Sequence, residues 1–273
     1  MPNGISLQEY HQFCDFLREA TGIQLGDNKQ YLVTSRLAHL LREDHLQSIS
    51  ELLTQIRGVN GRVLMQHVID AMTTNETNWF RDTYPFPIVF NKLLPEVNPQ
   101  GPAKIWCAAC SSGQEPYSLS INHDEELKAL NGYRGSLDII ATDLSETILN
   151  KAKKAEFDQL SVVRGLSEQR RDKYFDLLTS GHYKLKPHIQ QKVKFRQLNL
   201  KDSYSSMGKF DIIFCRNVLI YFNSEFKIDI LHRLSHCLKP RGFLFLGASE
   251  SANGLCNDFE MVRCHPGIVY QLK

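Results

Sequence analysis

FDIIFCRNVLIYF, residues 210–222, begins with the composition of a central β-strand and then changes character. Asp211 is followed by four apolar residues, a run of the length typical of a strand buried on both faces. Arg216 and Asn217 then bring a guanidinium and an amide to the end of this strand, and Tyr221 follows shortly after. In an open α/β sheet, ligands bind beyond the carboxyl ends of the strands, so these side chains indicate a binding site.

Six other segments around this stretch also have the composition of strands. The seven predicted strands are KIWCAA (104–109), LDIIATD (137–143), VKFRQLNL (193–200), FDIIFCRN (210–217), GFLFLGAS (242–249), FEMVRC (259–264) and GIVYQLK (267–273). The first five are separated by segments long enough for crossover helices, as a parallel sheet requires. Only His265 and Pro266 join the last two, which must therefore pair antiparallel. The pattern predicts an α/β fold with five parallel strands and a reversed terminal hairpin.

The residues before this sheet are predicted to form a separate domain of helices. LQEYHQFCDFLREATG (7–22) has apolar residues at helical spacing and ends in glycine. Val33, Leu37 and Leu41 fall on one face of a second predicted helix, Asn28 to Leu46. A proline-rich segment follows, and the strand pattern begins after it. We therefore assign residues 1–72 to an all-helical N-terminal domain and residues 73–273 to the α/β domain.

Composition excludes several classes of protein. The chain has 273 residues, of which 42% are hydrophobic, and a formal net charge of +2, so its overall charge favours neither a nucleic acid nor a membrane surface. No apolar run approaches the roughly 18 residues of a membrane helix, and the first residues lack the pattern of a signal peptide, so we expect a cytoplasmic protein. Cys107 and Cys110 have redox-motif spacing, but no second pair or nearby histidine completes a zinc site. We predict no metal.

Polar side chains recur at the ends of successive predicted strands. These are Glu115 (after a turn containing Gly113), Asp143, Asn199, Arg216 and Asn217. A single Asp or Asn at such a position is usually a turn former or a cap. Because the carboxyl ends of parallel strands meet at one edge of the sheet, their recurrence favours one shared ligand site.

The acidic residues at these ends suit a particular ligand. Asp143 can accept hydrogen bonds from both hydroxyl groups of a ribose, and Glu115 would repel a pyrophosphate while attracting a cation. The first turn also lacks the G-x-G-x-x-G fingerprint of a dinucleotide site. S-adenosylmethionine has a ribose and two cationic centres but no phosphate, and it fits these features.

Five stretches resemble the chemotaxis receptor methyltransferases, the CheR family. They are TTNETNWFRD (73–82), SGQEPYS (112–118), ATDLSETILNKA (141–152), FCRNVLIYF (214–222) and LKPRGFLFLGASES (238–251), and the resemblance covers nearly the whole chain. It implies a methyltransferase that converts glutamate side chains of methyl-accepting chemotaxis receptors into methyl esters, using S-adenosylmethionine and releasing S-adenosylhomocysteine. It also implies the seven-stranded, Rossmann-like methyltransferase sheet, with a small β-subdomain inserted at about residues 157–191.

The resemblance assigns roles to individual residues. Arg81 and Tyr221 are the implied catalytic pair, and the segment 73–82 is expected to cover the site. From the residues alone, Tyr221 would read as a packing aromatic and Arg81 as a solvated helix residue. We also predict that Arg216 pairs with Glu115 or with a strand-end carbonyl group. The implied cofactor-binding residues are Asn75, Thr77, Arg81, Glu115, Asp143, Asn199, Leu200, Asn217 and Val218.

Receptor contacts are predicted on the helical domain and on the insertion. Arg36, His39 and Arg42 recur every third residue on the second predicted helix, a stripe that suits an acidic helical receptor but equally a solvated face. His39 and Leu40 stand where well-known relatives have basic residues, so this chain departs from the family there. The insertion resembles that of relatives that hold a receptor's C-terminal peptide but is slightly shorter. We therefore expect methylation of receptors with or without such a tail.

Two other functions share part of this pattern. A non-catalytic S-adenosylmethionine-binding sensor or adaptor would keep the cofactor residues but would not need both Arg81 and Tyr221, and both are present. A methyltransferase for RNA or a small molecule would keep the sheet. RNA is disfavoured because the charge is near neutral and no cluster combines aromatic and basic residues.

Overall fold

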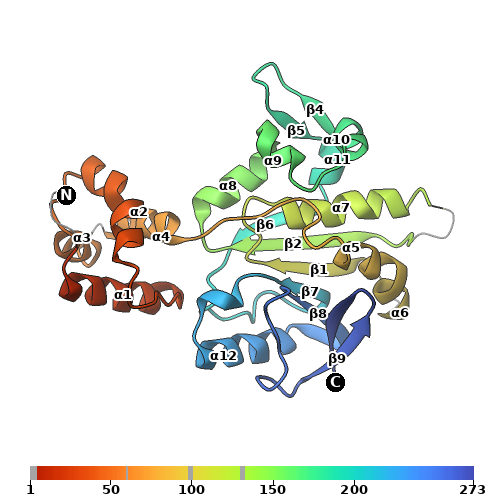
Figure 1. Ribbon diagram of the computed structural model, residues 1–273. Helices are drawn as coiled ribbons and strands as arrows, with labels where there is room; N and C mark the ends of the chain where they lie inside the picture. Colours follow the sequence, from red (N-terminus) through yellow and green to blue (C-terminus); the bar gives the residue numbers. More distant parts are fainter. Residues whose placement is uncertain (1–4, 60, 98–100, 130–132) are drawn as a thin grey trace.

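The computed structural model describes residues 5–59, 61–97, 101–129 and 133–273. Figure 1 shows a helical domain at one side of a central sheet and a small β-subdomain projecting beyond the sheet. The expected arrangement of an α/β methyltransferase sheet, an inserted β-subdomain and a preceding helical domain is confirmed. Among the helices of the described ranges, none has both the length and the apolar composition needed to cross a membrane.

The N-terminal domain consists of four helices, α1 (Leu7–Thr21), α2 (Gln30–Glu43), α3 (Ile49–Ile56) and α4 (Gly61–Met72). α1 begins with a capping box, in which Ser6 and Glu9 satisfy each other's backbone N–H groups, and it ends at Gly22, whose φ of 80° is left-handed. Phe13, Leu17 and Leu37 are fully buried between the helices. α2 is shorter than the predicted helix because Lys29 and Asp44 are its caps.

All seven predicted strands are present. The central sheet contains β1 (Ala103–Ala108), β2 (Leu137–Asp143), β6 (Val193–Gln197), β7 (Phe210–Cys215), β8 (Leu238–Leu246), β9 (Phe259–Cys264) and β10 (Gly267–Leu272), in the order β6-β2-β1-β7-β8-β10-β9. The first five strands run parallel to one another, and β10 pairs antiparallel with both β8 and β9, as predicted. The chain order reverses direction across the sheet at β1 and β7, where the ligand site is expected.

β8 starts earlier than predicted because it contains a bulge. Phe210 pairs with Leu238 and Ile212 with Phe243, so the β8 side has extra residues between these two pairs. The extra residues include Pro240, which cannot donate to a neighbouring strand, and Arg241, whose φ is 62°. The predicted strand begins only at Gly242, after this proline.

Helices cover both faces of the sheet (Figure 1). On one face α7 (Gln114–Glu126) packs over buried residues such as Ile105 and Cys107, together with α5 (Pro85–Ile88), the π-helical turn η1 (Val89–Leu93) and α6 (Leu94–Val97). On the other face α12 (Ser224–Ser235) packs over Trp106 and Ile213. Neighbouring side chains of one strand point to opposite faces of the sheet, so they pack in different hydrophobic cores.

The β-subdomain lies between α8 (Glu146–Lys154) and β6. It contains β3 (Glu156–Phe157), α9 (Gln159–Val163), α10 (Glu168–Tyr174), β4 (Phe175–Leu177), β5 (Tyr183–Leu185) and α11 (Pro187–Gln190). Its three strands form a separate antiparallel sheet in the order β3-β5-β4. The insertion therefore has its own small sheet, which is not continuous with the central sheet.

Candidate active site

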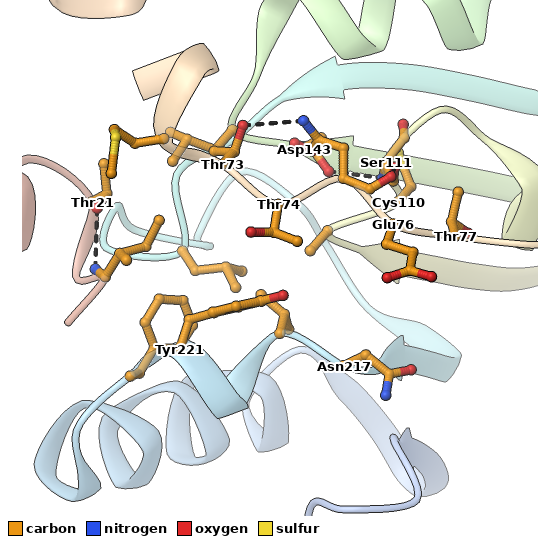
Figure 2. A pocket seen from close by; sticks show the side chains of 18 of the residues that line it. Thr21, Thr73, Thr74, Glu76, Thr77, Cys110, Ser111, Asp143, Asn217 and Tyr221 are labelled. Carbon is orange, nitrogen blue, oxygen red and sulfur yellow. Dashed lines mark hydrogen bonds between the residues drawn. The ribbon is translucent and has the colours of Figure 1, made fainter. Parts of the chain in front are cut away.

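One cavity lies beyond the carboxyl ends of β1, β2, β6 and β7. Residues from the helical domain, from the segment after α4 and from the four strand ends all line it. Figure 2 shows Tyr221 on one side of this cavity, with Thr74 and Asp143 on the other. The lining includes every predicted cofactor-binding residue and both predicted catalytic residues: Asn75, Thr77, Arg81, Glu115, Asp143, Asn199, Leu200, Asn217, Val218 and Tyr221.

The turn between β1 and α7 has a strained backbone. Ala109 and Ser111 have φ values of 59° and 51°, and Gly113, the N-cap of α7, has a φ of 93°. A Cβ atom at Gly113 would lie 3.1 Å from the Tyr117 ring, so glycine suits both the conformation and the space. This turn places Glu115 in the first turn of α7, facing the cavity.

Asp143 ends β2 with its carboxylate held by the backbone. Its two oxygens accept hydrogen bonds from the N–H groups of Ser111 (2.8 Å) and Ser145 (3.0 Å). Burial raises the pKa of the Asp143 carboxyl, and these backbone donors act in the opposite direction. Each carboxylate oxygen keeps a further lone pair, so the group can still accept from a ligand.

Arg216 joins both sides of the cavity through charge-assisted hydrogen bonds. Its Nη1 donates to Glu115 Oε2 (2.7 Å), and its Nη2 donates to Asp82 Oδ2 (2.6 Å) and to the carbonyl oxygen of Arg81 (3.0 Å). The predicted pairing with Glu115 is confirmed, whereas Asp82 was not foreseen. Burial raises the pKa of Glu115, although the neighbouring Arg216 lowers it.

Arg81 lies in a second strained turn. The residues Phe80, Asp82 and Thr83 have φ values of 49°, 64° and 52°, each in the left-handed region. Such residues cost about 1–3 kcal/mol each and persist only where the surroundings hold them. Arg216 binds the carbonyl group of Arg81, and the N–H of Phe80 donates to Ser118 Oγ of α7 (3.0 Å). The turn is thus tied to the sheet and to α7.

Glu250 fixes the loop that carries Asn217 and Tyr221. Its Oε2 accepts from the N–H groups of Asn217 (2.7 Å) and Gly247 (2.6 Å), and its Oε1 accepts from the N–H of Ile220 (3.3 Å). Tyr221 ends the short 3-10 helix η2 (Leu219–Tyr221) that follows. Glu250 was not predicted as a site residue, although it follows the fifth parallel strand and lies in one of the quoted stretches.

The helical domain forms part of the cavity wall. Asn199 Nδ2 donates to the carbonyl oxygen of Ala20 (2.7 Å), near the C-terminal end of α1, and the backbone N–H of Gln24 donates to the carbonyl of Tyr221 (2.9 Å). Thr21 and the residues 23–25 consequently line the cavity beside the segment 72–77. The predicted cover, residues 73–82, is therefore extended by the α1–α2 connection, which has no distinctive sequence pattern.

The three predicted receptor-binding residues do not share one exposed stripe. Arg36 is half-buried and donates to the carbonyl oxygens of Met72 (2.6 Å) and Thr73 (3.1 Å), so it lines the cavity. The reason is electrostatic, because the free carbonyl groups at the C-terminal end of α4 attract a cation. His39 and Arg42 remain exposed on α2.

Two sets of potential metal ligands are present among the described residues, and of these Cys110 alone lines the cavity. Cys107 and Cys110 are buried, and burial raises the pKa of both thiols. Within the described residues, the group of three possible ligands is His232, Cys256 and Asp258, and none of these lines the cavity. His232 and Asp258 are already hydrogen-bonded to each other (2.9 Å).

Comparison with known families identifies the two domains of the chain. The family profile "CheR methyltransferase, all-alpha domain" matches residues 8–73, and "CheR methyltransferase, SAM binding domain" matches residues 75–268. The chain belongs to the CheR methyltransferase family. The chain is thus a methyltransferase of the chemotaxis class, and its cofactor is S-adenosylmethionine.

Known CheR-type proteins resemble the chain over nearly its full length. It is 52% identical to chemotaxis protein methyltransferase Cher2 of Pseudomonas putida, over 97% of this chain and 98% of that protein. It is 51% identical to chemotaxis protein methyltransferase 1 of Pseudomonas aeruginosa (97% and 98% covered) and to the chemotaxis protein methyltransferase of Vibrio parahaemolyticus (98% and 98%). The sequence similarity thus spans both the helical and the sheet domain.

Proposed function

We propose that this CheR methyltransferase transfers a methyl group from S-adenosylmethionine to glutamate side-chain carboxylates of chemotaxis receptors. The products are glutamate methyl esters and S-adenosylhomocysteine. The observation that carries the proposal is the convergence on one cavity of all the residues assigned from the resemblance, including Arg81 and Tyr221. They come from five separate segments of the chain, which the fold alone brings together.

The chain's own residues fit this cofactor. Asp143 accepts from the two ribose hydroxyl groups, using the lone pairs that its backbone donors leave free. Glu115 attracts the ammonium group, and Arg216 holds that carboxylate in place through one of its two oxygens. Asn75, Thr77, Asn199, Leu200, Asn217 and Val218 complete the wall of the site.

The reaction requires orientation and not proton removal. The cofactor supplies an electrophilic methyl group on a sulfonium ion. A glutamate carboxylate is ionised at neutral pH, since a model Glu has a pKa of about 4.3, and its oxygen attacks without a general base. Arg81 binds the far oxygen of this carboxylate, and the Tyr221 hydroxyl sets the angle of the near one.

Receptor docking is assigned to the exposed face of α2. His39 and Arg42 are exposed there and would contact an acidic helix in the cytoplasmic region of a receptor. His39 also lies beside Glu43 (2.9 Å), and Arg42 Nε donates to the carbonyl oxygen of Ala38 (3.2 Å). Arg36 is used differently, because its guanidinium is engaged by the backbone carbonyl groups after α4. The docking function of α2 therefore rests on two of the three residues of the predicted stripe.

The test is methyl transfer from labelled S-adenosylmethionine to membranes that contain chemotaxis receptors. We expect label on the receptors that mild alkali releases as methanol, as a carboxyl methyl ester requires. Receptors in which the candidate glutamates are replaced by alanine serve as the control. Label that resists alkali, or equal label on the control receptors, would contradict the assignment of glutamate.

A further inference from the structure

The β-subdomain is connected to the Arg81 turn by a buried tryptophan. Trp79, two residues before Arg81, is completely buried among the aromatic residues of the β-subdomain. Its ring lies edge-on to Phe157 (centroids 5.0 Å apart, 73° between planes) and to Phe175 (5.2 Å, 90°). The segment that covers the cavity is thus anchored outside the central sheet, in the small sheet of the insertion.

The backbone of Trp79 is held by the same subdomain. Its N–H donates to the carbonyl oxygen of Arg164 (3.0 Å), and its carbonyl oxygen lies against Gly165. A Cβ atom at Gly165 would lie 2.0 Å from that oxygen, and the φ of 91° also favours glycine. An ion pair between Arg164 and Glu76 (2.9 Å) adds a contact earlier in the covering segment.

Arg170 of α10 forms the second connection. Its guanidinium carbon lies 3.8 Å from the centre of the Phe80 ring, a cation–π contact next to Arg81 in the chain. The same guanidinium donates to both oxygens of Glu125 on α7 (2.9 and 2.8 Å), which fixes its plane. α7 also carries Glu115 in its first turn. Arg170 therefore holds the Arg81 turn in register with the helix that bears a cofactor-site residue.

We propose that the β-subdomain positions Arg81 through Trp79 and Arg170, so that Arg170 is a positioning residue for methyl transfer. The strained turn around Arg81 is held by Arg216 and Ser118 on the sheet side. Trp79 and Arg170 hold it on the opposite side, and a turn with left-handed residues on both sides of Arg81 needs both restraints. This proposal rests on the function proposed above for Arg81.

The experiment is a double-mutant cycle of Arg170→Gln with Arg81→Ala. The readouts are the single-turnover rate at saturating cofactor and receptor, and the affinity for S-adenosylhomocysteine by calorimetry. Arg171→Gln is the matched control, because it removes the same charge from the next position of α10, where the partner is the neighbouring Asp172. Thermal unfolding of each variant confirms that it is folded under the assay conditions.

We expect Arg170→Gln to lower the rate about tenfold, and Arg171→Gln to stay within about twofold of wild type. In the Arg81→Ala background, adding Arg170→Gln should change the rate and the affinity by less than about twofold, because both substitutions remove the same interaction. A full tenfold effect in both backgrounds would show that Arg170 acts independently of Arg81. A wild-type rate in Arg170→Gln would equally overturn the proposal.

The proposal can still be tested if a variant does not fold or if the wild-type protein is inactive. If Arg170→Gln does not fold, Glu125→Gln, which releases the guanidinium from its fixed plane, is put through the same cycle with the same criteria. If the wild-type protein methylates no receptor, the proposed function fails. The cycle on S-adenosylhomocysteine affinity needs no turnover and still tests the positioning.

Discussion

At the scale of single residues, Arg216 determines how the charges of the site are arranged. Its side chain is 1% exposed, and it binds one carboxylate on α7, another in the Arg81 turn and a backbone carbonyl group. Removing one member of such a buried network leaves an unpaired charge, which costs far more than the pair contributes. Arg216 therefore holds Glu115 and the backbone of Arg81 in place, and these two residues face the ligands.

Asp143→Ala should weaken the affinity for both S-adenosylmethionine and S-adenosylhomocysteine. The loss of a charged hydrogen-bond acceptor costs about 1.5–3 kcal/mol, or roughly one to two decades of affinity. Asp138→Ala is the control, since Asp138 lies at the other end of β2 and is paired with Lys194 at 3.6 Å. Calorimetry that finds wild-type affinity in Asp143→Ala would remove this residue from the site.

Glu115 should make cofactor affinity depend on pH. Its pKa is raised by burial, so lowering the pH through that value protonates Glu115 while ordinary carboxyl groups are still charged. The neutral form no longer attracts the ammonium group, and the affinity for S-adenosylmethionine should fall as the pH falls. Glu115→Gln should bind weakly and lack this pH dependence. Glu126→Gln is the control, because burial also raises the pKa of this α7 carboxyl group but it lies outside the cavity, and it should behave as wild type. A profile unchanged in Glu115→Gln would refute the assignment.

At the scale of elements, α2 has two separate tasks. Arg36 holds the covering segment after α4, whereas Arg42 is exposed about 1.7 turns further along the helix. We expect Arg36→Gln to weaken cofactor affinity and Arg42→Gln to leave it unchanged. In receptor binding the order should reverse, with Arg42→Gln having the larger effect. Equal effects of both variants in both assays would argue against this division.

The β-subdomain gives a prediction about the substrate. The insertion forms its own three-stranded sheet, and the sequence resemblance predicts that the protein does not depend on a receptor tail for binding. We expect receptors truncated at their C-terminal tail to be methylated as fast as full-length receptors. Initial rates on the two substrates at equal receptor concentration test this. Tight binding of a free tail peptide, together with lost activity on truncated receptors, would be the contrary result.

The strands and the polar residues at their ends were predictable from the sequence, because each is recognised from a few consecutive residues. Each central strand is a short apolar run, and its polar terminal residue follows directly in the sequence, as at Asp143 and Arg216. Contacts between distant segments left no such signal. The bond between Arg216 and Asp82 joins residues 134 positions apart, and the bond from Asn199 to Ala20 joins residues 179 apart. Only the folded chain reveals them.

At the scale of the whole molecule, two parts of the chain line the cavity and a third, the β-subdomain, holds its cover from outside. Several hydrogen bonds join the helical domain to the sheet domain, among them one from Asn199 to Ala20 of α1 (2.7 Å) and one from Thr147 to Asp70 of α4 (2.6 Å). The β-subdomain holds the covering segment from outside through Trp79. The ends of the sheet strands therefore supply most of the predicted cofactor residues, while the other two parts fix the segment that carries Asn75, Thr77 and Arg81.

The central claim is that this arrangement orients a carboxylate that is already ionised. The most direct measurement is the single-turnover rate of methyl transfer, at saturating cofactor and receptor, from about pH 6 to about pH 9 for the wild type and Tyr221→Phe. We predict a flat profile for both, a lower rate for Tyr221→Phe at every pH, and nearly unchanged affinity of that variant for S-adenosylhomocysteine. A wild-type rate that rose about tenfold per pH unit through neutrality would require a general base and would contradict the account.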